Sequence, residues 1–144
     1  MPGVLRILIG LSTIVTFGTT YAQGNDSLAR KCKDLPALVL GTDEAGFAVG
    51  QKTCELETGK CYKLAIESTG KQEYAIRGPD FFRNLWSRKI ETGDMEIKAK
   101  HIYPLEFEVE AKAELYFVQI VTGTFTLFAD RPAKKGTVVT ITVK

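Results

Sequence analysis

Three cysteines and one histidine are the side chains in this 144-residue sequence that bind metals most readily. They are Cys32, Cys54, Cys61 and His101. A zinc site needs closely spaced Cys or His pairs, and the spacing here fits no zinc ribbon. A blue-copper site needs a Cys thiolate together with two imidazoles, which one histidine cannot supply. The sequence therefore predicts no standard metal centre.

A looser metal site is an alternative. His101 could bind copper with Met95 and with the carboxylates Glu106, Glu108 and Glu110, if a strand or loop gathered them. These glutamates alternate with apolar residues and are expected on one solvent-facing side of a strand. The simpler interpretation is a surface histidine and the charged face of an edge strand, where charges deter edge-to-edge pairing.

The motifs of common enzyme classes are missing. The sequence has no Gly-x-Ser-x-Gly, no glycine-rich phosphate-binding loop and no histidine placed to activate a nucleophile. The net charge of +2 gives no electrostatic footprint for nucleic acid. We therefore predict neither an enzyme nor a nucleic-acid-binding protein.

The first 22 residues have the pattern of a secretory signal. The segment has one early basic residue, Arg6, and an apolar core from Val4 to Phe17, which is shorter than the roughly 20 residues of a membrane helix. Cleavage is expected after Ala22, leaving one domain over residues 23–144. If the segment stayed uncleaved it would anchor the protein to a membrane; either alternative predicts export.

Export places the cysteines in an oxidising environment, where a disulfide is the default. Cys32 could pair with Cys54 or with Cys61, Cys54 could pair with Cys61, or none could pair, since connectivity cannot be deduced from sequence. The odd number leaves at least one thiol. A structural role is expected for these residues.

The rest of the chain shows short alternating runs separated by turn residues, a pattern typical of a β-sandwich or barrel. Glu57–Lys60 is expected to be the tight turn of a hairpin, with Gly59 at the position of positive φ. Helical spacing groups Phe81, Phe82, Leu85 and Trp86, and Asp80 is a candidate N-cap. One or two helical turns are expected to plug an end of the sandwich.

The C-terminal segment resembles the cupredoxins, the blue-copper β-sandwich family. Gly123-Thr-Phe-Thr-Leu-Phe128 matches the approach to the family's copper loop, and the cysteine of that loop falls at Ala129. No His or Met follows in residues 130–144. A second match, Gly70-Lys-Gln-Glu-Tyr-Ala-Ile76, puts Gln72 at the position of the first histidine. A Phe-Phe-Arg-Asn insertion at residues 81–84 resembles one in periplasmic relatives.

The resemblance implies an all-β, Greek-key, antiparallel sandwich with one short helical insertion. Because Gln72 and Ala129 replace ligands, copper binding and electron transfer are not carried over. In the family this end of the sandwich meets partners, and here Arg131, Lys134 and Lys135 could dock on an acidic surface. The sequence thus favours an exported, non-catalytic interaction module without a cofactor, whose partner is another periplasmic or membrane-attached protein. The alternative is a metal-handling protein of copper or iron homeostasis.

Overall fold

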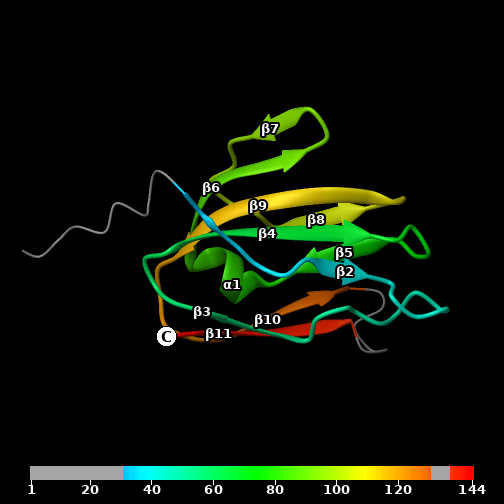
Figure 1. Ribbon diagram of the computed structural model, residues 1–144, viewed down its shortest axis with the longest axis horizontal. Coiled ribbons are helices and arrows are strands. Elements are labelled where there is room, and N and C mark those ends of the chain that lie inside the picture. Colours follow the sequence, from blue (N-terminus) through cyan, green and yellow to red (C-terminus); the bar gives the residue numbers. More distant parts are fainter. Residues whose placement is uncertain (1–30, 131–136) are drawn as a thin grey trace, which may run out of the picture.

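The computed structural model describes residues 31–130 and 137–144, which form a β-sandwich (Figure 1). One sheet has the order β1-β4-β9-β6-β7, with β2 also beside β4. Its strands are β1 (Lys33–Asp34), β2 (Leu38–Leu40), β4 (Cys61–Ser68), β6 (Leu85–Thr92), β7 (Met95–Ile97) and β9 (Ala111–Gln119). The other sheet has the order β3-β11-β10-β5-β8. Its strands are β3 (Thr53–Leu56), β5 (Tyr74–Arg77), β8 (Pro104–Phe107), β10 (Gly123–Ala129) and β11 (Val138–Val143).

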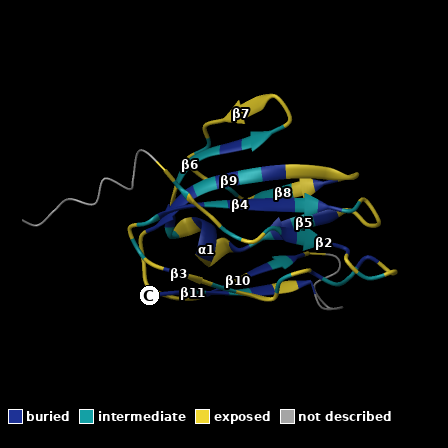
Figure 2. Ribbon diagram, in the orientation of Figure 1, coloured by how far each residue is buried: buried dark blue, intermediate teal, exposed yellow. Residues whose placement is uncertain are grey.

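Alternation along the C-terminal strands produces the two faces of the second sheet. Val139, Ile141 and Val143 of β11 are buried, and the residues between them are exposed or half-buried. This is the pattern of a strand with one face on the core and one toward water. In Figure 2 the central strands, such as β4, are mostly buried, whereas β7 and the outer turns are exposed. The all-β prediction is confirmed.

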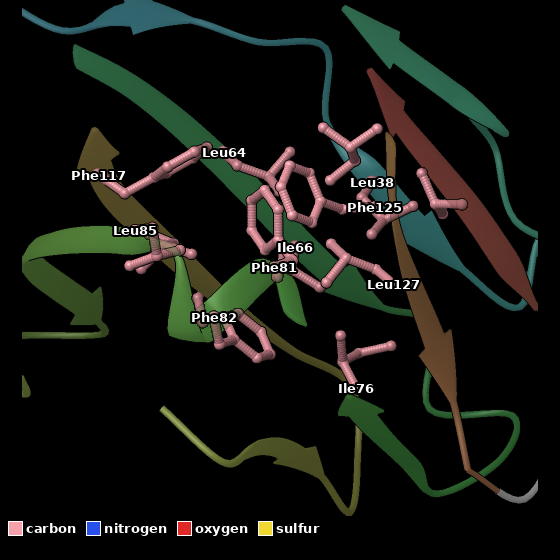
Figure 3. Packing of buried hydrophobic residues seen from close by; sticks show 14 of the residues in the cluster. Leu38, Leu64, Ile66, Ile76, Phe81, Phe82, Leu85, Phe117, Phe125 and Leu127 are labelled. Carbon is pink, nitrogen blue, oxygen red and sulfur yellow. The ribbon is translucent and has the colours of Figure 1, made fainter. Parts of the chain in front are cut away.

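A short helix closes the core at one end. Helix α1 (Pro79–Arg83) places Phe81, which has no exposed surface, against Phe82, Phe117 and Phe125 with ring centroids 5.4 to 6.2 Å apart. Side chains from both sheets converge on it (Figure 3). The helical insertion is thus present.

Two details of the predicted helix were wrong. The N-cap residue is Gly78, and no side chain caps the helix; Asp80 lies in its first turn. Leu85 and Trp86 belong to β6, because the backbone there pairs with β9. Leu85 is buried, whereas Trp86 on the opposite side of the strand is about half exposed. Pairing with a neighbouring strand outweighed the local helical spacing.

The expected Glu57–Lys60 hairpin was also wrong. Gly59 has the positive φ of 74°, but the turn passes from one sheet to the other, since β3 pairs with β11 and β4 with β9. Thr58 and Leu56 exchange backbone hydrogen bonds with Lys144, which holds β3 against the C-terminal strand. That pairing is parallel, as are β1–β4 and β2–β4. The described sheets are therefore mixed, with antiparallel pairs in the majority.

The first edge of the β1-β4-β9-β6-β7 sheet is interrupted and covered. Pro36, which has no backbone N–H, separates β1 from β2. On the outer side of β2, Gly50 donates a backbone hydrogen bond to Val39, and Leu40 forms an isolated antiparallel bridge with Val49. The segment 47–49 contributes only this bridge and no continuous strand. The edge therefore lacks a continuous row of open backbone groups.

The proposed signal segment, residues 1–22, lies outside the described residues. In the described part of the chain, no helix combines the length and hydropathy needed to cross a membrane.

Candidate functional site

The family's copper ligands would lie at the end of the sandwich where β10 leads into the loop to β11, so this end is the candidate site. Ala129, at the predicted cysteine position, has no exposed surface and belongs to the hydrophobic core. It lies opposite Ile76 of β5, and its backbone N–H donates to Thr137 O at 3.1 Å. A methyl group in this position offers no electron pair to a metal.

Gln72 lies in different surroundings. Its side chain is exposed, and its Nε2 donates to Ala45 O at 3.2 Å on the turn of residues 43–46. An amide is a hard ligand, unlike the sulfur and imidazole that copper prefers. The donor groups at the two matched positions therefore do not fit a blue-copper centre.

Hydrogen bonds fix the loops around this end. Tyr74 Oη donates to Gly46 O at 2.7 Å in a buried position, and Thr137 Oγ1 donates to Phe47 O at 2.6 Å. Thr137 is almost fully buried. Two backbone N–H groups, of Ala48 and Phe47, donate to Asp43 and hold the pKa of that carboxyl below its ordinary value. The loops are thus held together by polar contacts within the chain.

The predicted docking residues Arg131, Lys134 and Lys135 lie outside the described residues. Asp130, the described residue just before them, is held in two ways. Its backbone N donates to Ala75 O at 3.0 Å, and its Oδ2 forms an ion pair with Arg77 Nε at 2.7 Å. Arg77 also donates to Tyr103 Oη at 2.6 Å. Sequence analysis missed this Arg77 cluster, because its three members are distant along the chain.

Beside the Arg77 cluster is a hollow of about 290 Å³ at the edge formed by β5 and β8. It is lined in part by the carboxylates Glu73, Glu106, Glu108 and Asp130. Glu106 and Glu108 are exposed, and β8 is an edge strand, as predicted. The apolar alternation was expected to continue to Val109, but Val109 is 66% exposed because β8 ends at Phe107. Glu110 lines a different hollow.

The other members of the alternative metal set are separated between elements. Met95 begins β7 in one sheet, while Glu106 is on β8 in the other, and His101 is exposed in the segment between them. Neither Met95 nor His101 lines the β5–β8 hollow. Among residues 31–130 and 137–144, no group of three or more His, Cys, Asp or Glu residues is placed to hold a metal ion.

The cysteines adopt one of the predicted alternatives. Cys32 and Cys61 form a disulfide that ties the start of the described chain to β4, over a sequence separation of 29. Cys54 carries a free thiol and is half-buried on β3. Burial raises the pKa of this thiol above its ordinary value, so the nucleophilic thiolate is disfavoured. A structural role fits both observations.

An apolar group at the opposite end of the sandwich was not predicted. Trp86, Ile120 and Val121 are 49%, 60% and 43% exposed. They lie where β6 begins and β9 ends. These two strands are antiparallel neighbours, and just beyond their paired residues Ile120 N donates a hydrogen bond to Asn84 O. Exposure depends on which strands end together, so the sequence pattern carried no signal for it.

Comparison with known proteins gave matches among solved structures alone: no family model and no curated protein sequence matched. A laccase from Pediococcus acidilactici aligns with a TM-score of 0.62 and 6% identity over 82% of this chain and 28% of its own. The multicopper oxidase McoA from Aquifex aeolicus aligns with a TM-score of 0.60 and 9% identity over 78% of this chain and 29% of its own. A copper nitrite reductase from Nitrosomonas europaea aligns with a TM-score of 0.52 and 11% identity over 63% of this chain and 32% of its own.

These identities are low, so the matches concern the fold alone, and the chain spans about a third of each of those proteins. Two mixed sheets with one short helix agree with them in architecture. The chain has the cupredoxin-like β-sandwich fold.

Proposed function

We propose that this protein is an exported, non-catalytic interaction module, which keeps the cupredoxin-like framework and uses its loop end to dock another periplasmic or membrane-attached protein. The observation that carries this proposal is Ala129. The position matched to the family's copper-binding cysteine holds a methyl group packed into the core, and Gln72 replaces the matched histidine. The Cys32–Cys61 disulfide supports export, since such bonds persist in oxidising compartments.

Charge supports the choice of docking surface. Arg131, Lys134 and Lys135 fall within six residues that follow Asp130, whose own charge is already paired with Arg77. Hydrogen bonds from Tyr74 and Thr137 tie the neighbouring segment of Gly46 and Phe47 to the described residues beside this loop. A cationic loop would favour an acidic partner surface and would speed association at low salt.

The first experiment measures copper. We expect the purified protein, dialysed against Cu(I) or Cu(II), to bind no stoichiometric tight copper and to show no blue colour. A tight one-to-one complex of the unchanged protein would overturn the proposal. If His101→Ala then abolished it, the metal-handling alternative would replace it.

The second experiment measures docking. A photo-crosslinking residue at position 134, in the protein exported by its native cells, is expected to trap one discrete partner. Charge reversal at Arg131 and Lys135 should abolish that product, whereas Lys144→Glu, just after the last strand, should leave it unchanged. Equal crosslinking by both variants would contradict a role for the basic loop.

A further inference from the structure

Within residues 31–130 and 137–144, the outer side of β7 pairs with no strand, which distinguishes it from the other edge of its sheet. β7 pairs with β6 on one side and is the last strand of the β1-β4-β9-β6-β7 order. The β6–β7 hairpin stands at the margin of the sandwich (Figure 1), and β7 is exposed along its length (Figure 2). We call the outer side of Met95–Ile97, together with Lys98, the β7 edge.

Hairpin geometry determines which backbone groups the β7 edge presents. Gly93 and Asp94 form a two-residue turn between the partners Thr92 and Met95. In such a hairpin the two residues that flank the turn exchange backbone hydrogen bonds. Along the strand, residues whose backbone groups point toward the partner strand then alternate with residues whose backbone groups point away from it. The backbone groups of Met95 and Ile97 therefore point toward β6, and those of Glu96 point away from the sheet. Lys98 is the next outward position.

An apolar row reaches the β7 edge from the core. Leu115, Ile90 and Ile97 are successive partners across β9, β6 and β7. Their exposed fractions rise from 1% and 5% to 39% at Ile97. Met95, on the same side of β7, is 60% exposed. The row thus ends in apolar surface that a further strand would cover.

A charged row reaches the β7 edge on the other face. Glu114, Glu91 and Glu96 are successive partners across the same strands. Like charges opposite each other are destabilising, and lysines offset them here. Lys89 contacts Glu91 and Glu96, and Lys98 Nζ lies 2.5 Å from Glu96 Oε1. The next position in this row would favour a cation.

We propose that two copies of this chain associate through the β7 edge, antiparallel about a twofold axis at Ile97. This register places Ile97 opposite Ile97 of the second copy, so the apolar row continues into the second sheet. Glu96 of each copy faces Lys98 of the other, and both positions point their backbone groups outward. The charges of Glu96 and Lys98 would deter many other strands from pairing here. In this register each of them faces the opposite charge on a second copy.

The test is a charge swap followed by sedimentation from micromolar to millimolar concentration. We expect a reversible dimer of the unchanged full chain. Lys98→Glu and Glu96→Lys should each weaken dimerisation by about tenfold, since twofold symmetry repeats every cross-strand pair. The double variant Glu96→Lys/Lys98→Glu should restore it, which also shows that the single variants fail for reasons other than misfolding. Lys144→Glu, on the other sheet, is the matched control.

The register is tested separately with Ile97→Cys in a Cys54→Ser background. A cysteine on the twofold axis should oxidise to a covalent dimer faster than Met95→Cys, which would face Ala99. A monomer at every concentration would overturn the proposal. So would a dimer that Lys98→Glu leaves unchanged, because its interface would lie elsewhere. The outcome is independent of the proposed docking function, which uses the opposite sheet's loop.

Discussion

Removing the Cys32–Cys61 disulfide should destabilise the protein by a calculable amount. The bridge closes a loop with a sequence separation of 29. The chain-entropy relation for a loop of that length gives about 3.6 kcal/mol at 25 °C. This is a large share of the 5–15 kcal/mol typical of a whole domain. We therefore expect Cys32→Ala/Cys61→Ala to fold with a greatly reduced free energy of unfolding.

Urea unfolding followed by far-UV circular dichroism measures this loss. The unfolded chain without the cross-link is more expanded, so the slope m should also rise. Cys54→Ala is the matched control: it removes a half-buried thiol that takes part in no bridge, and about 1 kcal/mol or less is expected. Thiol titration of the denatured, unreduced protein should find a single thiol.

Two results would refute this reasoning. Three titratable thiols would mean that the bridge is absent from the purified protein. A loss below about 1 kcal/mol with an unchanged m would mean that the cross-link does not restrict the unfolded chain in the way the entropy relation assumes.

Three further predictions concern single residues. Gly70→Ala should lower the free energy of unfolding in urea more than Gly59→Ala does. Both glycines have positive φ, but a Cβ at Gly70 would lie 2.7 Å from the backbone N of Glu110, whereas a Cβ at Gly59 would have no heavy atom within 4 Å. Equal losses would show that the loop at Gly70 moves to accommodate the methyl group. The pKa of Asp43 is lowered in the folded protein, so its contribution to the free energy of unfolding is fully present above its unfolded pKa of about 3.9 and is lost as pH falls through the folded value. Asp43→Asn should therefore flatten that part of the curve of stability against pH. An unchanged curve would contradict a stabilising role for the Asp43 carboxylate. Phe81→Ala should cost about 3–5 kcal/mol by the same urea measurement, and a loss near 1 kcal/mol would mean that the aromatic core collapses around the gap.

Local patterns predicted the strands well, because side-chain alternation within one strand records which face is buried. Val139, Ile141 and Val143 alternate with polar residues in the sequence, and all three are buried. Strand partners are not a local property. The pairing of β3 with β11 joins segments more than eighty residues apart, and no turn signal near Glu57–Lys60 could reveal it.

The candidate site shows the same division. Ala129 could be placed at the ligand position by pattern, but its burial and the contacts around Gln72 required the structure. The Arg77 cluster and the exposed Trp86 arise where strands from different parts of the chain end together. A disulfide from Cys32 to Cys54 or Cys61 was among the predicted alternatives, and only the packing of the first described residues against β4 selects Cys61.

Pro36 has a consequence for stoichiometry. It divides the edge at the start of the β1-β4-β9-β6-β7 sheet into the short strands β1 and β2, and Gly50 and Val49 cover β2. Such a sheet can be extended from one side and not from the other. Association through β7 would use that side in both copies at once and stop at two, giving a closed pair instead of a growing fibre.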